Sequence, residues 1–216
     1  MSALLRLGRL SVASLLLLAV AACDDPSKGK SKAVTTEATP NAVEPKSAAT
    51  GATKYEFDPS TSKIEWTGSK VTAKHDGGFK TFRGNITVAD GAPEKGFVNV
   101  EIDVDSLWTT PERLVGHLKS KDFFDVETFP KATFVSSKIE KGGEKGHIVT
   151  GNLTFHGVTK SISFPASIKA SPASVDVDAE FAINRKDFGL SYAGAADDLI
   201  RDDVVIRLNV RAPKKG

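Results

Sequence analysis

The strongest constraint on the fold of this chain is a period-two alternation of apolar and polar residues. The apolar residues Val98, Val100, Ile102 and Val104 are separated by single polar or acidic residues. Because successive side chains of a strand point to opposite faces, this pattern predicts a half-buried β-strand. The same alternation recurs over residues 64–66, 82–88, 175–183 and 204–210. Strands are therefore expected to fill most of this part of the chain.

A β-hairpin is predicted where two alternating runs meet at His156 and Gly157. A two-residue turn requires positive φ, which Gly adopts freely and His tolerates better than most residues. That turn would pair Leu153 with Lys160 and make one hairpin face apolar except for this lysine. Regular alternation on many antiparallel strands predicts an all-β fold, an up-and-down barrel without exposed edges.

One short helix is predicted over residues 110–119, with Thr110 as its cap and Pro111 in its first turn. Leu114 and Leu118 would share one face of this helix. The aromatic-rich stretch of residues 122–130 follows, and so many rings in an irregular segment must cover apolar surface. We expect this loop to close one end of the barrel.

The N-terminus has the pattern of a cleaved signal peptide over residues 1–22. Arg6 and Arg9 precede an apolar run of about 13 residues, shorter than the roughly 20 that span a bilayer as a helix. Residues 20–23 (VAAC) resemble the lipobox of bacterial lipoproteins, which predicts lipidation of Cys23. As Cys23 is the sole cysteine, no disulfide or cysteine metal ligand is expected.

The segment that follows Cys23 indicates how the protein is attached and where in the cell it lies. Residues 23–53 contain three prolines and no Leu, Ile or aromatic residue, so they are expected to form a lipidated, disordered tether. The chain would then be a periplasm-facing lipoprotein of the bacterial cell envelope, attached to the membrane through its N-terminal lipid. Asp24 resembles the retention signal of enteric lipoproteins and favours the inner over the outer membrane.

The core residues belong to a single domain at residues 54–213, which holds every Phe, Trp and Tyr.

The chain has 29 basic and 27 acidic residues, and loss of two arginines with the signal peptide leaves 27 of each. A neutral chain argues against a nucleic-acid partner, which would require a clustered basic surface. The composition does not indicate an oligomeric state.

Catalytic and metal-binding patterns are missing from the sequence. The four histidines lack ligand spacing, and no nucleophile elbow, P-loop or dinucleotide fingerprint occurs. We therefore expect neither an enzyme nor a metal site, and no cofactor other than a bound lipid.

Three segments resemble the YceI-like polyisoprenoid-binding family in the order that the family has them. They are residues 117–130 (HLKSKDFFDVETFP), 151–160 (GNLTFHGVTK) and 184–190 (NRKDFGL). The resemblance implies an eight-stranded, lipocalin-like antiparallel barrel that holds a long isoprenoid lipid, of the polyprenyl or quinone type, as a carrier or sink.

The residues expected to line such a ligand site are mostly the inward apolar positions of the strands. They are Trp66, Val100, Ile102, Leu153, Phe155, Val158, Lys160, Ile162, Phe164 and Phe181. Lys160 would either meet a polar head group or extend its amine to water.

Two further hypotheses remain open at this point. An eight-stranded barrel is just wide enough either to hold a small ligand or to be filled by its own side chains. A filled barrel would indicate a structural or stress-related envelope protein, and a cryptic hydrolase is the third alternative.

For Arg185, an ion pair with Asp202 or Asp203 is expected rather than a ligand contact.

Overall fold

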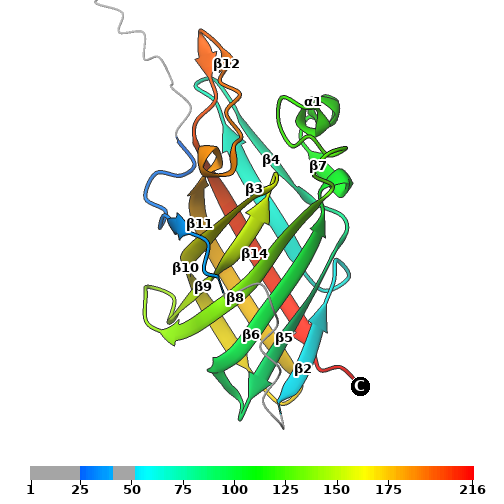
Figure 1. Ribbon diagram of the computed structural model, residues 1–216, viewed down its shortest axis with the longest axis vertical. Coiled ribbons are helices and arrows are strands. Elements are labelled where there is room, and N and C mark those ends of the chain that lie inside the picture. Colours follow the sequence, from blue (N-terminus) through cyan, green and yellow to red (C-terminus); the bar gives the residue numbers. More distant parts are fainter. Residues whose placement is uncertain (1–24, 41–51) are drawn as a thin grey trace, which may run out of the picture.

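The fold is an antiparallel β-sheet curled into a half-barrel (Figure 1). The computed structural model describes residues 25–40 and 52–216. Within these residues, one sheet holds twelve strands in the order β2-β5-β6-β8-β9-β10-β11-β14-β3-β4-β7, with β1 paired to β10. The strands are β1 (Val34–Glu37), β2 (Thr53–Phe57), β3 (Lys63–Ser69), β4 (Lys74–Phe79), β5 (Phe82–Ala89), β6 (Ala92–Asp103), β7 (Leu107–Thr109), β8 (Lys131–Lys141), β9 (His147–Phe155), β10 (Val158–Ala170), β11 (Ser174–Asn184) and β14 (Asp203–Pro213). A separate hairpin pairs β12 (Gly194–Ala195) with β13 (Asp198–Leu199).

The all-β prediction is confirmed, but the predicted closed barrel of eight strands is wrong: the sheet is a half-barrel of twelve strands, because long strands are interrupted and β1 adds to β10. β2 pairs with β5 and β3 with β4, and a turn separates β2 from β3. In that turn the Asp58 carboxylate accepts a hydrogen bond from the Ser60 amide at 2.8 Å. Between β4 and β5, the amides of Lys80 and Thr81 bond to Ser106 instead of to a neighbouring strand.

The curl brings the last long strand next to the first ones. Residues 205–209 of β14 pair with β3, and a single bridge joins Tyr55 of β2 to Lys214. Apolar residues inside the curl form two clusters, one around Phe57 and Phe82 and the other around Phe164 and Phe181. Val98, Ile168, Val177 and Leu208 contact both clusters, so the interior is continuous.

The predicted hairpin is confirmed in its turn and in its register. His156 and Gly157 form the turn with φ of 50° and 73°. Phe155 pairs with Val158 and Leu153 with Lys160, and the ladder continues to the pair of His147 and Ala166. Turn chemistry and alternation together therefore determine this part of the sheet.

Short helices lie beside one end of the curled sheet (Figure 1). Two 3₁₀ turns, η1 (Val104–Ser106) and η2 (Glu112–Leu114), precede α1 (Val115–Lys119), and a third, η3 (Arg185–Phe188), follows β11. The prediction that Thr110 caps the helix is wrong: Pro111 holds that position without a side-chain bond, and the Thr110 hydroxyl donates to the Asp76 carbonyl at 3.4 Å. None of the helices in the described ranges is long and apolar enough to cross a membrane.

The expected disorder of residues 23–53 does not hold for residues 25–40, which we call the N-terminal segment. Its strand β1 pairs with residues 160–163 of β10, and the backbones of Ser31 and Ala33 bond to Ala182 of β11. The pairing of β10 with β11 covers only the four pairs from Ser167–Asp178 to Ala170–Val175, so the segment enters where the two strands separate.

Polar contacts also hold the N-terminal segment in place. The Asn152 side chain accepts from the Thr39 amide at 3.0 Å and donates to the Thr39 carbonyl at 2.9 Å. Lys30 forms an ion pair with Glu180 at 2.6 Å. The segment is thus ordered by backbone pairing and polar groups, although it has no buried large apolar residue. The predicted signal peptide and Cys23 lie outside the described residues.

Candidate functional site

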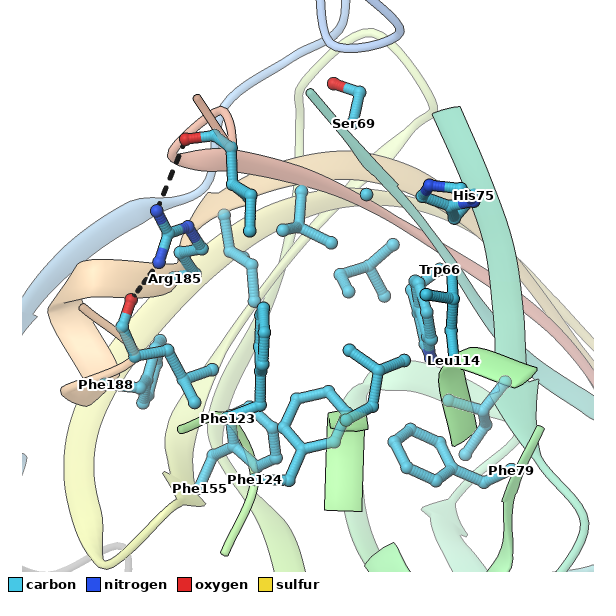
Figure 2. A pocket seen from close by; sticks show the side chains of 18 of the residues that line it. Trp66, Ser69, His75, Phe79, Leu114, Phe123, Phe124, Phe155, Arg185 and Phe188 are labelled. Atoms are coloured by element: carbon cyan, nitrogen blue, oxygen red, sulfur yellow. Dashed lines mark hydrogen bonds between the residues drawn. The ribbon is translucent and has the colours of Figure 1, made fainter. Parts of the chain in front are cut away.

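An apolar cavity of about 540 Å³ lies inside the curled sheet. Inward-facing residues of β3, β6, β8, β9, β10, β11 and β14 form its wall, and most of them are aliphatic or aromatic. Figure 2 shows Trp66, Phe79, Phe124 and Phe155 around this space. A volume of this size is within the usual range of roughly 300–1,000 Å³ for small-molecule pockets. The barrel interior is therefore hollow here instead of being filled by its own side chains.

The cavity opens at the end of the sheet where α1 and β12 lie (Figure 1). Three of its lining residues are exposed: Arg113 in η2, next to α1, His117 in α1 and Ala195 in β12. We call this opening the mouth. The deeper wall, including Ile162 and Phe181, is buried.

Eight of the ten residues expected at a ligand site line the cavity. They are Trp66, Val100, Ile102, Leu153, Phe155, Ile162, Phe164 and Phe181. Val158 and Lys160 do not. Val158 packs with the second core cluster beside the turn. Lys160 is drawn to the N-terminal segment, where its Nζ lies 2.6 Å from Glu37 Oε1.

Aromatic residues near the mouth were not among the expected site residues. The rings of His117, Phe123 and Tyr192 contact one another with centroids 5.1 to 5.2 Å apart. Phe124 packs against Phe155 at 5.4 Å. The aromatic-rich stretch of residues 122–130 was the signal for this cluster, and its Phe123 and Phe124 line the cavity. The expected closure of one end of the barrel by this loop stays a prediction.

Arg185 forms the predicted ion pair at the end of the cavity. Its guanidinium is 5% exposed and lies 3.3 Å from Asp202 Oδ1, as predicted. It also lines the cavity, as Figure 2 shows. Its guanidinium donates to the carbonyls of Leu190, Ile200 and Arg201. Burial lowers the pKa of this guanidinium, and the charge of Asp202 opposes the shift. Its hydrogen bonds hold the rim of the mouth together.

Unlike Arg185, two buried polar atoms of cavity-lining residues have no hydrogen-bond partner within residues 25–40 and 52–216. They are the indole nitrogen Nε1 of Trp66 and the hydroxyl of Ser69. A buried polar group without a hydrogen bond costs about 1–3 kcal/mol. Both donors are neutral, and neighbouring atoms cover them, so they do not face the open space of the cavity. The described residues contain no group of three or more His, Cys, Asp or Glu side chains placed to hold a metal ion.

Comparison with known proteins identifies the family of this cavity-forming domain. Residues 55–212 match the YceI-like domain. This chain belongs to the YceI-like family. The match covers almost the whole curled sheet, whereas the N-terminal segment lies outside it.

Relatives of this YceI-like chain occur among bacterial proteins. A UPF0312 protein of Pseudomonas putida strain GB-1 is 35% identical over 136 residues, which are 60% of this chain and 71% of that protein. A UPF0312 protein of Pseudomonas fluorescens strain SBW25 is 32% identical over 148 residues, 65% of this chain and 77% of its own length.

Solved structures share the YceI-like fold. BcnA of Burkholderia cenocepacia superposes with a TM-score of 0.63 at 27% identity, covering 70% of this chain and 96% of that one. A polyisoprenoid binding domain from Saccharophagus degradans, implicated in plant cell wall breakdown, has a TM-score of 0.59 and covers 76% of this chain and 99% of its own. At 17% identity the latter shows a shared fold only.

Proposed function

We propose that this protein binds a long-chain isoprenoid lipid in the cavity, as a carrier or sink in the bacterial envelope. The observation that carries the proposal is the apolar cavity of about 540 Å³ inside a YceI-like domain. The Saccharophagus degradans neighbour, whose fold is the same, is described as a polyisoprenoid binding domain. The proposed activity is binding and involves no catalytic step.

An apolar cavity of this kind favours binding of isoprenoid chains but distinguishes poorly between chains of different length. Burial of each CH₂ group contributes about 0.8 kcal/mol, from which the cost of ordering a flexible chain is subtracted. One methylene more or less changes binding by about 1–3 kcal/mol at most, so chains of similar length are poorly separated. Selectivity must therefore come from the end group of the lipid.

The polar atoms on the wall favour an uncharged end group inside the cavity. The donors without partners, on Trp66 and Ser69, are both neutral. The buried cation of Arg185 already bonds to three carbonyls and Asp202. An uncharged end group, such as a quinone carbonyl or an alcohol, therefore suits the cavity interior, because it requires no free positive charge.

The direct test is mass spectrometry of organic extracts from natively purified protein. A polyprenyl or quinone-type lipid in the extract, in a fixed ratio to protein, is the expected result. Extracts without lipid, together with failure of the purified protein to take up added polyprenol or quinone, would favour the alternative of a structural or stress-related protein.

Membrane attachment through Cys23 is the second part of the proposal. A diacylglyceryl group plus an N-acyl chain would anchor the protein durably, because single acyl chains bind only marginally. The motif at residues 20–23 supports this, and Asp24 supports the inner membrane. Detergent partitioning of Cys23→Ser and wild-type protein tests it. A Cys23→Ser protein that still enters the detergent phase would contradict the anchor.

A further inference from the structure

We propose that the mouth of the cavity docks on the surface of a lipid bilayer, so that the lipid moves between membrane and cavity without crossing water. This inference rests on the proposed function, both for the ligand and for the anchor at Cys23. It adds an orientation of the domain and a named contact surface.

The first observation is an exposed apolar rim around the mouth. Only four large hydrophobic residues are exposed in the part of the chain that the structure describes, and three lie here: Val71 at 46%, Leu199 at 49% and Tyr192 at 37%. The fourth, Val34, lies on β1, where it pairs with Ser163. Exposed apolar groups gathered at one opening mark a contact surface, whereas single ones do not.

The apolar rim is braced from beneath, so its side chains are held outward. The Val71 amide donates to the Leu199 carbonyl at 3.2 Å. The Asp198 carboxylate forms an ion pair with Lys70 and accepts from the amide and hydroxyl of Thr72 at 3.1 and 2.8 Å. The loop at residue 71 and the β12–β13 hairpin therefore form one unit. Neither Val71 nor Leu199 lines the cavity, so the pair has no role in its wall.

The second observation is where the N-terminal segment begins. The Asp25 carboxylate lies 3.4 Å from the Arg201 guanidinium, and the Arg201 amide donates to the Ser69 carbonyl on the cavity wall at 2.8 Å. In Figure 1 the segment starts near the end of the sheet that carries α1 and β12, away from the C-terminus. Cys23 is two residues before Asp25, and two residues reach at most about 7 Å. A lipid on Cys23 would therefore hold the mouth at the membrane.

These observations are independent and indicate the same orientation. The rim offers apolar side chains to a bilayer, and the ordered segment allows little separation between anchor and mouth. With the mouth at the bilayer surface, an isoprenoid can slide into the apolar cavity while its chain stays out of water. That route avoids the free-energy cost of exposing the apolar lipid chain to water, which grows with every CH₂ group.

The test of orientation uses the full-length lipidated protein in phosphatidylcholine and phosphatidylglycerol vesicles that carry nitroxide lipids. A thiol-reactive fluorophore is attached to Leu199→Cys or, as the control, to Ala173→Cys in the turn at the far end of β10. We expect several-fold stronger quenching at residue 199. Equal quenching at both positions, or no quenching at 199 in anchored protein, would overturn the inference.

The design separates this inference from the proposed function. Wild-type protein that takes up the dye at Cys23, or that leaves the vesicles, would show that the anchor itself is wrong. Wild-type extracts without isoprenoid would refute the ligand. If the protein is anchored and carries lipid but the fluorophore at residue 199 is not quenched, only the proposed orientation is refuted.

A transfer assay tests the rim directly. Val71→Asp combined with Leu199→Asp is expected to slow isoprenoid transfer from vesicles to protein several-fold while leaving the final lipid content unchanged. Val34→Asp is the matched control, an exposed apolar residue on the outer wall, and it should transfer at the wild-type rate. Equal rates for all three proteins would overturn the proposed contact.

Discussion

The phenyl rings of Phe164 and Phe181 stack face to face inside the curl, with centroids 4.2 Å apart and planes 13° apart. The strands that carry them, β10 and β11, pair only up to Ser167 and Asp178, three residues away. The stack therefore spans the opening between the two strands that β1 fills from outside. It lies on the cavity wall, so it links the stability of the sheet to the shape of the site.

Replacement of Phe181 by Ala is expected to lower the free energy of unfolding by about 3–5 kcal/mol, because it removes a buried ring and leaves a void at the strand opening. Phe181→Leu, which keeps most of the apolar volume, should cost clearly less. Denaturant unfolding measures both. A loss below about 1 kcal/mol for Phe181→Ala would show that the stack does not hold the strands together.

Leu153→Trp distinguishes a hollow interior from a filled one. Leu153 lines the cavity, so the larger indole should enter ligand space, abolish isoprenoid binding and leave the fold intact. A close-packed core would instead lose about 1–3 kcal/mol through strained rotamers. Thr154→Trp is the control, because the Thr154 hydroxyl contacts Thr159 on the other face at 2.9 Å. Denaturant midpoints and extracted lipid are the two measurements.

Gly77→Ala should disturb the wall at Trp66. A methyl group at Gly77 would lie 2.2 Å from the Trp66 ring and 2.6 Å from the Trp108 carbonyl, and the backbone cannot move away cheaply. We expect a shift of Trp66 toward the cavity, seen as altered tryptophan fluorescence and weaker lipid binding. Gly116→Ala in α1 meets open space and should be neutral or stabilising by up to about 1 kcal/mol. Unchanged fluorescence in Gly77→Ala would contradict the predicted displacement.

Acidification should release the N-terminal segment only at low pH. Hydrogen bonds from Lys30 to Glu180 and from Ser27 to Asp25 lower the pKa of each carboxyl below its usual 4.5 or 3.8. The bond from Lys30 joins the segment to β11, so the lowered pKa of Glu180 means that its carboxylate stabilises the docked segment above its unfolded pKa. That contribution is lost as the pH falls through the folded value. Asp25 contributes to docking only through the smaller effect of the Arg201 charge.

We therefore expect hydrogen exchange of the β1 amides, corrected for intrinsic rates, to stay slow from pH 8 to 5 and to rise below about pH 4. Glu180→Gln should raise the exchange rate above about pH 5 and have little effect at the lowest pH, where Glu180 is already protonated. Release of the segment between pH 5 and 7 would argue against this account.

The parts of this fold that follow local rules could be predicted from sequence. The register of β9 with β10 follows from the turn at His156 and Gly157, and alternation indicates which side chains face inward. Strand interruptions could not be predicted, because the turn at Asp58 replaces ladder bonds without altering the alternation on either side. Alternation also does not distinguish a hollow interior from a filled one.

Contacts between distant segments explain the remaining differences. Asn152 and Ser161 have the pattern of solvated outer-face residues, yet each is 4% exposed because the N-terminal segment covers them. Lys160 lies on an apolar face, but Glu37, far away in sequence, binds its amine. Tertiary structure brings such polar partners together, so the alternation of apolar and polar residues in the sequence does not reveal them.

The position of β1 has a consequence for shortened forms of this protein. A chain beginning at Thr53 would keep the whole YceI-like domain but expose the edge of β10 that pairs with β1 at residues 160–163, while the opposite edge stays paired with β9. Unpaired strand edges template association with other chains. The short domain is then expected to self-associate or to exchange N-terminal strands between copies, as in domain swapping. The N-terminal segment thus protects each molecule from its neighbours.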